Sequence, residues 1–426
     1  MSIQSFNSAA TPPIEFGGGA EHARAHLPAV AEVPAEHIDA LSRICPTDVS
    51  RADRAEHGRD WWPLAMRWSL AGEAPQIPGA VCRPRDTGEV SALLAYCNSH
   101  GIAVTVSGGR SGVCGGAIPL NGGVALDTTS MQGVESVDTV SGIICALSGT
   151  FGPDLENAAR SNGLTVGHFP QSFDLATVGG WVACRGAGQY STRYGKIEDI
   201  VHALEVVMAD GTVIRTGESS AETHAPDAPG YDLPGVLTGS EGTLAFITAV
   251  TVRLMTKPEA VRTILALFDS LDDAGAATSA VVCAGIVPAA LEFVDGVTIG
   301  ALRGGGFTEY PEGVEALLLV EVEGLTEACA AEAAAIETIL ATNGATEVRV
   351  AASAAERQQL WRGRKGALGA LGRLAPNYYI QDGVVPRTRL VEVLGKVQAL
   401  AKRENLLIAN VFHAGDGNLQ IGRAHV

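Results

Sequence analysis

The histidine in the stretch His413-Ala414-Gly415-Asp416-Gly417-Asn418 is the residue of this sequence that could most readily do chemistry. Its two glycines let the backbone turn tightly, so the His, Asp and Asn side chains can gather around one ligand. An imidazole there could bind a divalent metal and acidify a substrate hydroxyl. A lone histidine, however, is more often a structural hydrogen-bonding group. Asp416 and Asn418 fit two roles equally well, because they could orient His413 or simply close the turn.

Arg364 is the second candidate, because it interrupts the apolar face of a helix predicted over residues 352–373. A cation on an apolar face needs a partner or a ligand. A guanidinium can bind a carboxylate through two parallel hydrogen bonds, which suits the carboxylate of a substrate. The alternative is a structural ion pair with a protein carboxylate such as Asp382. The rest of the helix face is apolar: Leu360, Trp361, Leu368 and Leu371.

Three loops rich in glycine and other small residues could hold an extended ligand. Loop 1 (residues 107–112) follows a predicted strand over 103–106, loop 2 spans 171–188, and loop 3 spans 239–244. Successive backbone N–H groups in such a loop suit a pyrophosphate. Loop 1 alone is equally compatible with an ordinary turn, because its spacing matches neither the dinucleotide-fold nor the P-loop motif. Three such loops in one domain favour the ligand-binding interpretation.

The elements that must position these residues follow from periodicity. Asp86 to Glu89 offers a capping box for an amphipathic helix that ends at Gly101. Short apolar runs predict four further strands of the first half: 124–126, 143–147, 203–209 and 245–254. Beyond Pro258 the order is strand, helix, strand, strand, helix, strand: 261–267, 271–285, 289–294, 316–322, 326–343 and 346–350. This order predicts a split ferredoxin-like sheet, and the helix with Arg364 follows it.

Composition limits the classes of partner and fold. The 426 residues are enough for two or three domains. The net charge of −17 and the lack of a Lys/Arg block exclude a nucleic-acid partner. The eight cysteines are scattered without a Cys-x-x-Cys motif, and no apolar run spans a membrane. We therefore expect a soluble cytoplasmic protein with reduced thiols. Residues 1–78 are expected to be a loosely packed arm, with Trp61 and Trp62 as packing residues.

The three loops in this order, with Tyr194-Gly195 and Glu198-Asp199 after the second, resemble the flavin domain of vanillyl-alcohol-oxidase-like FAD enzymes. The resemblance implies an α+β fold: a two-part FAD-binding domain over residues 79–257, then a ferredoxin-like antiparallel-sheet cap domain flanked by helices over 258–420.

The same resemblance implies which residues bind FAD. No histidine lies in loop 1, so we expect non-covalent FAD. Arg110 stands where relatives usually have Gly, and its side chain could face the phosphates or solvent. Glu241 is expected to shape its loop. The implied FAD-binding residues are Val106, Ser107, Gly108, Gly109, Arg110, Ser111, Gly112, Gln171, Ser172, Thr177, Gly179, Gly180, Cys184, Arg185, Gly186, Ala187, Glu241, Gly242, Thr243, Leu244 and Ile247.

The second half is similar to the family that includes the FAD-binding subunit of glycolate oxidase and the D-lactate and D-2-hydroxyglutarate dehydrogenases. The matching segments are residues 361–365, 376–387 and 410–419. The resemblance implies oxidation of a small D-2-hydroxy acid by hydride transfer to flavin N5, with Arg364 on the substrate carboxylate. It also implies an electron acceptor (oxygen, quinone, cytochrome or a flavoprotein), possible oxidase-complex subunits, and a cytoplasmic location that includes the inner-membrane periphery.

In this family His413 would bind a divalent metal, zinc or similar, together with a second histidine seven residues later and a Glu further on. Position 420 is Gln here. The closing stretch 421–426 matches what a common sequencing adaptor encodes, so we hypothesise that it is a non-native tail and that Gln420 replaces a histidine. A chain cut there is expected to bind metal weakly and to be poorly active or inactive.

Two other functions remain open at this point. The segments 177–181 and 194–199 also look close to the flavin half of alkyldihydroxyacetonephosphate synthases. The cap of that family does not carry the His-Ala-Gly-Asp-Gly-Asn segment, which argues against it. The third interpretation is a non-catalytic flavin-binding subunit of an oxidase complex, against which Arg364 and His413 argue.

Overall fold

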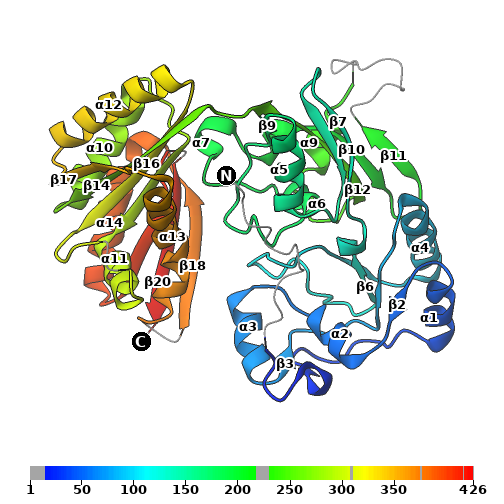
Figure 1. The fold of residues 1–426 in the computed structure, drawn as a ribbon. Helices are drawn as coiled ribbons and strands as arrows, with labels where there is room; N and C mark the ends of the chain where they lie inside the picture. The colour runs from blue at the N-terminus through cyan, green and yellow to red at the C-terminus, as the bar shows by residue number, and fades with distance from the viewer. Residues whose placement is uncertain (1–14, 217–229, 308–309, 375–376, 416, 426) are drawn as a thin grey trace. The chain divides into compact units, whose positions relative to one another are not determined.

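The computed structural model describes residues 15–216, 230–307, 310–374, 377–415 and 417–425, which form two compact units (Figure 1). The first unit comprises Met1–Ala187 and Lys196–Thr256, and the second comprises Gly188–Gly195 and Lys257–Val426. A short segment of the first half, including helix α7 (Ser191–Tyr194), therefore belongs to the second unit. None of the helices in these described ranges is long and apolar enough to cross a membrane.

Two sheets organise the first unit. The four-stranded sheet has the order β2 (Thr47–Asp48), β4 (Ala80–Cys82), β6 (Val124–Asp127), β5 (Val104–Ser107). The antiparallel five-stranded sheet has the order β11 (Val213–Thr216), β10 (Val201–Val207), β12 (Phe246–Arg253), β8 (Ile143–Leu147), β7 (Val134–Asp138). Two-residue strands form two further pairs: β1 (Arg24–Ala25) with β3 (Glu73–Ala74), and β9 (Leu164–Thr165) with β13 (Met255–Thr256). The predicted strands of the first half are thus present, with ends shifted by up to two residues.

The helices of the first unit are mostly short. Its longest helix, α4, begins after Asp86, whose carboxylate accepts a hydrogen bond from Glu89 N at 2.9 Å, and ends at Gly101 with φ 64°. Both boundaries were predicted from the sequence. The helices are η1 (Ala20–His22), α1 (Ala35–Ser42), α2 (Arg51–Glu56), α3 (Pro63–Leu70), α4 (Thr87–His100), η2 (Thr128–Ser130), α5 (Gly152–Ser161), α6 (Val178–Ala183), α8 (Ile197–Ile200) and α9 (Leu233–Leu237).

The expectation of a loosely packed N-terminal arm is wrong for its described part, residues 15–78. Leu41 of α1 is fully buried in the core formed by α4 and the four-stranded sheet. His57, Arg59 and Asp60, just after α2, are also buried. Charge and Pro/Gly content concealed this packing: His57 and Arg59 are buried in ion pairs with Asp127 and Glu56, and Asp60 accepts a hydrogen bond from Trp62 N.

A seven-stranded antiparallel sheet forms the second unit. Its order is β17 (Glu347–Val350), β14 (Ala260–Phe268), β16 (Ala316–Gly324), β15 (Ala290–Asp295), β19 (Leu407–His413), β20 (Asn418–His425), β18 (Asn377–Val384). The first four strands have the ferredoxin-like order, which confirms the predicted cap fold. The last three strands extend that sheet. The stretch 421–425, which we hypothesised to be non-native, is part of β20.

Helices cover both faces of this sheet (Figure 1). Phe293 of β15 and Phe412 of β19 stack at 4.8 Å on the face that packs against α10, α12 and α14. The other face packs against α11 and α13. The sequence did not predict α11 or α14. The helices are α10 (Leu271–Cys283), α11 (Gly296–Gly304), α12 (Thr326–Thr342), α13 (Ala354–Leu371), η3 (Arg387–Arg389) and α14 (Leu390–Arg403).

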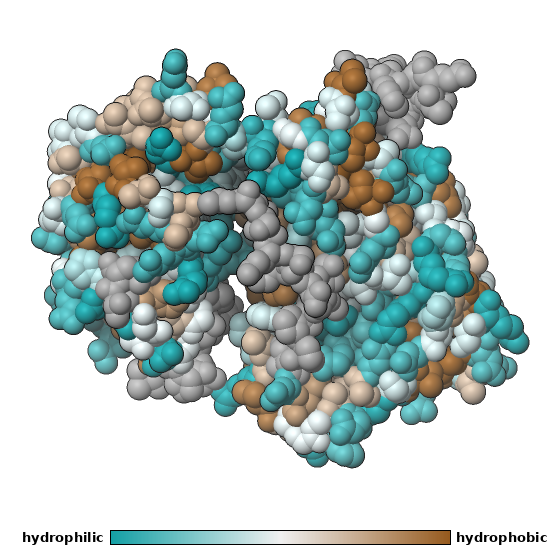
Figure 2. All heavy atoms as spheres, viewed as in Figure 1, coloured by the Kyte–Doolittle hydropathy of each residue, from teal (hydrophilic) through white to brown (hydrophobic). Residues whose placement is uncertain are grey.

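Hydropathy varies over short distances on the visible surface of each unit, where hydrophobic residues lie in small groups among hydrophilic ones (Figure 2). Apolar atoms ordinarily contribute more than half of a folded protein's surface, so scattered groups of this kind need no partner to explain them.

Candidate active site

The three predicted loops converge in the first unit. Loop 1 lies against loop 2, since a methyl group added at Gly108 would stand 2.6 Å from Thr177 Oγ1. Loop 3 is bonded to the helix of loop 2, because Gly239 N and Glu241 N donate to the carbonyl oxygens of Val182 and Ala183, each at 2.9 Å. Loop 3 also touches the strand before loop 1, where Gly242 lies against Val106. The three loops, which the sequence predicted to form one ligand site, therefore lie together in the fold.

Each loop contains one non-glycine residue in a left-handed conformation: Arg110 (φ 53°), Arg185 (φ 52°) and Glu241 (φ 51°). Among the described residues, only Asn405 shares this property. Such conformations are uncommon for L-residues and gather at ligand-binding sites, where the surrounding structure enforces them. The interpretation of these loops as ordinary turns is therefore disfavoured.

The sequence left open whether the Arg110 side chain faces the phosphates or solvent, and in the structure it is directed toward His57 instead. Its Nη1 lies 2.9 Å from His57 Nε2 and 3.5 Å from Ser107 Oγ. The guanidinium is thus directed inward, toward the end of α2. Sequence reasoning missed His57 entirely, and no spacing along the chain connects it with loop 1.

The second unit brings Arg364 and His413 together on a residue that the sequence analysis did not single out, Glu292. Arg364 Nε donates to Glu292 Oε2 at 2.8 Å, and His413 Nδ1 donates to Glu292 Oε1 at 2.7 Å. Strand pairing explains the second contact, because Glu292 of β15 and His413 of β19 are direct partners across the sheet. One carboxylate therefore fixes both candidate catalytic side chains.

Burial makes this cluster electrostatically strong. Glu292 and Arg364 are 0% and 2% exposed, whereas His413 retains 15%. Burial alone raises the pKa of the Glu292 carboxyl, but Arg364 and His413 outweigh burial and hold that pKa below its usual value. Because the ionised carboxylate only accepts, His413 must carry its proton on Nδ1. His413 Nε2 is then left with a lone pair for a proton or a ligand.

The predicted alternative for Arg364 was an ion pair with a protein carboxylate, and the structure shows one. The partner is Glu292 rather than Asp382, whose side chain lies outside the described residues. Arg364 Nη2 stands 2.6 Å from Glu292 Oε2 but is too poorly directed for a hydrogen bond, so it is a buried polar atom without an acceptor. Asp416 and the side chains of Tyr378, Tyr379 and Asn418 also lie outside the described part of the chain.

A second buried carboxylate anchors the same helix. Glu321 of β16 is 0% exposed and accepts from Arg357 Nη2 at 2.7 Å and from Trp361 Nε1 at 2.8 Å. Tyr190 and Thr263 donate to it as well, each at 2.5 Å. Arg357, Trp361 and Arg364 recur at helical spacing along one face of α13. The two glutamates therefore fix both the rotation of α13 and the position of Arg364.

Known proteins match this chain over both units. The FAD-binding domain family matches residues 78–217, and the family "FAD linked oxidases, C-terminal domain" matches residues 257–422. The glycolate oxidase subunit GlcD of Escherichia coli K12 is 36% identical over 342 residues, which cover 80% of this chain and 68% of that relative. The chain belongs to the FAD-linked oxidase family. This confirms the family resemblance of the sequence, and the protein is an FAD-linked oxidoreductase.

Other relatives of this FAD-linked oxidase carry related names. GlcD of Bacillus subtilis is 34% identical, over 84% of this chain and 75% of that relative, and a D-lactate dehydrogenase of Anaerostipes hadrus is 32% identical, over 92% and 81%. Among solved structures, an alkyldihydroxyacetonephosphate synthase superposes with a TM-score of 0.78 at 20% identity, covering 98% of this chain and 84% of that one. At that identity the similarity shows the fold alone.

The residues around the converged loops fit FAD. Side chains next to loops 1 and 2 carry buried polar atoms without a hydrogen-bond partner among the described residues: Thr128 Oγ1, Ser148 Oγ, Trp181 Nε1 and both ring nitrogens of His168. Burial lowers the pKa of His168 to about 4, so its ring is neutral near neutral pH and offers one donor and one acceptor. Unpaired buried polar groups are costly in a finished fold. A ligand with ring, ribityl and phosphate polar atoms would supply their partners.

The described residues do not form a metal site in this FAD-linked oxidase. Within the described ranges, no group of three or more His, Cys, Asp or Glu side chains is arranged to hold a metal ion. His413 is a single potential ligand, whereas such sites in proteins ordinarily use three or four. We therefore derive no step of the reaction through a metal.

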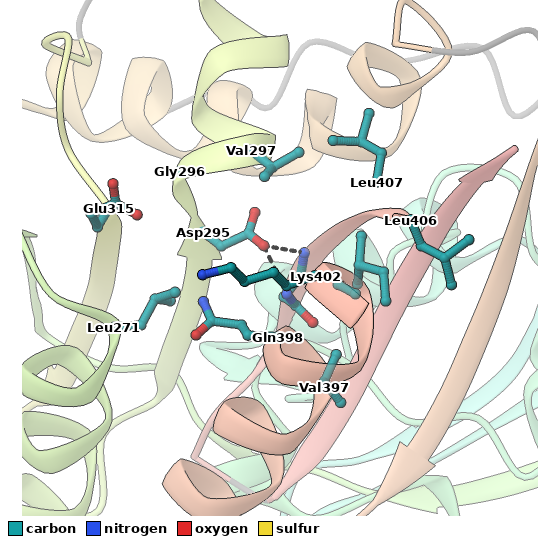
Figure 3. Close-up of a pocket in the computed structure, with 13 residues that line it drawn as sticks. Leu271, Asp295, Gly296, Val297, Glu315, Val397, Gln398, Lys402, Leu406 and Leu407 are labelled. Atoms are coloured by element: carbon teal, nitrogen blue, oxygen red, sulfur yellow. Dashed lines mark hydrogen bonds between the residues drawn. The ribbon is translucent and has the colours of Figure 1, made fainter. Parts of the chain in front are cut away.

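A separate cavity of about 260 Å³ lies in the second unit, on the sheet face opposite Arg364 (Figure 3). Gln398 and Lys402 of α14 point into it, and Asp295 of β15 lines its floor. Asp295 Oδ2 accepts from both Asn410 N and Asn410 Nδ2, at 2.7 and 2.8 Å. Asn410 thus already supplies the hydrogen-bond donors for this buried carboxylate oxygen. We therefore assign the cavity no part in the reaction.

Replacing Gly109 with alanine is expected to abolish FAD retention. The added methyl group would overlap the carbonyl oxygen of Leu175, and backbone cannot move aside as a flexible side chain can. Overpacking of this kind costs about 1–3 kcal/mol or more and would force loops 1 and 2 apart. The measurement is the flavin-to-protein absorbance ratio after gel filtration. Gly300→Ala is the control, because no atom lies within 4 Å of its added methyl group. Full flavin content in Gly109→Ala would contradict the loop assignment.

Proposed function

We propose that this FAD-linked oxidase oxidises a small D-2-hydroxy acid, of the glycolate or D-lactate type, to the 2-oxo acid. Relatives named glycolate oxidase subunit and D-lactate dehydrogenase, which align with 80–92% of this chain, support the substrate class. FAD, bound non-covalently at the three loops, would supply the hydride acceptor at flavin N5. The protein's own residues must then hold the carboxylate and receive the hydroxyl proton.

The Glu292 cluster is the observation that carries this proposal. Arg364 is the cation that we assign to the substrate carboxylate, and its Nη2, which lies in the ion pair with Glu292 but makes no hydrogen bond, supports a role beyond that pair. His413 Nε2 is the group that we assign to the substrate hydroxyl proton. Its partner Glu292 stabilises the imidazolium that forms when Nε2 takes that proton. A cation and a base held by one carboxylate are the groups that a hydroxy acid requires.

Assistance by a divalent metal, zinc or similar, is a separable part of the proposal. A metal held by His413 Nε2 would acidify the hydroxyl, whose proton would then pass to solvent rather than to the imidazole, and Glu292 would orient a metal ligand. The described residues supply only His413 toward such a site, so chelation must decide between the two roles.

Anaerobic mixing with glycolate, D-lactate or D-2-hydroxyglutarate is expected to bleach the bound flavin with at least one of the three acids. The absorbance of oxidised flavin near 450 nm is the readout, and each acid is tested with and without a chelator. Loss of bleaching after chelation supports the metal role, and unchanged bleaching supports His413 as the proton acceptor. L-lactate is the matched control for the D configuration.

Flavin that stays oxidised with all three acids would favour the alternative that this chain is a non-catalytic flavin-binding component of an oxidase complex. The GlcD relatives are named as subunits, which is consistent with this alternative. An alkyldihydroxyacetonephosphate synthase-like activity is the other alternative that the sequence leaves open, and the shared fold does not favour it over a hydroxy-acid oxidase. We place the protein in the cytoplasm or at the periphery of the inner membrane, with oxygen, a quinone, a cytochrome or a flavoprotein as electron acceptor.

A further inference from the structure

A buried group of charges lies directly beneath loop 1 of the FAD-binding unit, and His57 is at its centre. The His57 side chain is 3% exposed. Three elements meet there: the end of α2, the end of β6 and loop 1. The charged groups that interact with His57 are Asp48, Asp53, Glu56, Arg110 and Asp127. Arg59 pairs with Glu56, and Arg83 pairs with Asp53 and Asp127.

One nitrogen of His57 is committed to carrying a proton. His57 Nδ1 lies 2.9 Å from the backbone carbonyl oxygen of Asp53. A carbonyl oxygen only accepts, so Nδ1 must be the donor. The protonation state of the ring is therefore decided at the other nitrogen, Nε2.

His57 Nε2 faces two partners with opposite requirements. Arg110 Nη1 lies 2.9 Å away and can only donate. Asp127 Oδ2 lies 3.0 Å away and, when ionised, can only accept. If the ring is neutral, Nε2 accepts the hydrogen bond from Arg110, but a lone pair of Asp127 Oδ2 then faces a nitrogen without a proton. If the ring is protonated, Nε2 donates to Asp127, but its N–H then faces the N–H of Arg110.

The other contacts of Asp127 keep it ionised in either case. Arg83 Nε donates to Asp127 Oδ2 at 3.2 Å, and Thr129 N and Oγ1 donate to Oδ1 at 2.9 and 2.7 Å. Burial works against the charge; a hydrogen bond from protonated His57 lowers the pKa of Asp127 most, and the bonds from Thr129 lower it further. When His57 is neutral, Arg83 and Thr129 still donate to the two carboxylate oxygens, which favours the ionised form, so Asp127 does not resolve the conflict by taking the proton. Either His57 stays neutral, or it takes a proton and Arg110 moves away from His57 Nε2.

We propose that Arg110 is a phosphate-binding arm, and that its movement from His57 to the FAD pyrophosphate is coupled to uptake of one proton by His57. When loop 1 holds the pyrophosphate, the guanidinium finds a better acceptor there than the imidazole. His57 Nε2 then takes a proton from water and closes an ion pair with Asp127. Release of FAD reverses both steps. The inference rests on the placement of FAD at loop 1 and not on the substrate of the enzyme.

Proton uptake on FAD binding is the measurement that tests this coupling. The flavin is removed, and FAD is titrated back calorimetrically in two buffers with different heats of ionisation. We expect uptake of at most one proton per FAD, and an affinity that falls by up to tenfold per pH unit on the alkaline side. The diester phosphates of FAD do not titrate near neutral pH, so the proton must be taken up by the protein.

Two variants remove the coupling in different ways. In Arg110→Gly, His57 pairs with Asp127 at all times, so proton uptake is lost and FAD binds about tenfold or more weakly. In His57→Gln the amide cannot titrate, so uptake is lost and the affinity no longer depends on pH in this range. His22→Gln, at a 77% exposed histidine of the same unit, is the control and retains the uptake.

Three results would overturn the proposal: no uptake by the unaltered protein, uptake unchanged in Arg110→Gly, or uptake unchanged in His57→Gln. Failure of FAD to bind at all would overturn it together with the cofactor placement. Proton-coupled FAD binding without bleaching by any hydroxy acid would instead contradict only the proposed function. The two inferences therefore fail separately.

Discussion

Glutamine in place of Glu292 is expected to lower the free energy of unfolding of the second unit by about 3–5 kcal/mol, because it leaves a buried cation without its counter-charge. Arg364 is 2% exposed, so water cannot replace the lost carboxylate. The amide keeps the shape of the side chain, which separates loss of charge from loss of packing. The measurement is the urea unfolding midpoint, followed by tryptophan fluorescence, since Trp361 lies on the same helix face.

An exposed ion pair in the same unit provides the matched control. Glu312 pairs with Arg303 at 2.8 Å but is 85% exposed. Glu312→Gln should therefore change stability by less than about 1 kcal/mol. The double variant Glu292→Gln with Arg364→Met removes both charges and should recover a large part of the loss. Equal midpoints for Glu292→Gln and Glu312→Gln would show that the Glu292 cluster does not stabilise the fold.

The pH dependence of this stabilisation has a definite sign. The pKa of Glu292 is lower in the folded protein than in the unfolded chain, because Arg364 and His413 outweigh burial. Its contribution is therefore fully present above the unfolded pKa and is lost as the pH falls through the folded pKa. The difference between the unaltered protein and Glu292→Gln should accordingly shrink toward acid pH. A difference that grows on acidification would contradict this assignment.

The cap fold was predictable from sequence because its strands and helices are long and periodic, and their order allows few arrangements. The partner of Arg364 was not predictable. Asp382 was the nearer carboxylate in sequence, but β18 is separated from β15 by β19 and β20 in the sheet. Glu292 lies 121 residues from His413 along the chain, and only the pairing of β15 with β19 places them side by side. A charge within the apolar run Leu291-Glu292-Phe293-Val294 was the available signal.

The FAD loops were predictable as loops, whereas what lies beneath loop 1 was not. Glycine clusters mark the places where backbones approach closely, and the structure brings the three together. No sequence pattern indicates that His57 and Asp127 lie near loop 1. His57 is 53 positions from Arg110 along the chain, and Asp127 is the last residue of a short strand. Their pairing depends on how α2 packs under β6. Local patterns thus indicate where a ligand binds, and long-range packing determines how its binding is tuned.

Lysine in place of Arg364 is expected to raise the hydroxy-acid concentration for half-maximal flavin bleaching by about 10²-fold, while leaving most of the stability intact. Lysine keeps the positive charge beside Glu292, so the carboxylate retains a counter-ion. A single ammonium cannot bind a carboxylate through two parallel hydrogen bonds, and such charge-assisted bonds are worth about 1.5–3 kcal/mol each. The measurement is stopped-flow bleaching over a range of concentrations of whichever acid reduces the flavin, beside urea midpoints of the same preparations.

Arg357→Lys makes the same chemical change seven residues earlier on the same face of α13, beside a different buried carboxylate, Glu321. We assign Arg357 no contact with substrate, so its variant should share the modest effect on stability without the effect on half-maximal concentration. If Arg364 were only a structural counter-ion, the two variants would behave alike in both measurements. A selective rise in the half-maximal concentration at Arg364, with an unchanged maximal bleaching rate and equal midpoints for the two, supports a guanidinium that holds the substrate carboxylate, whereas a fall in the maximal rate would indicate displacement of His413 through Glu292.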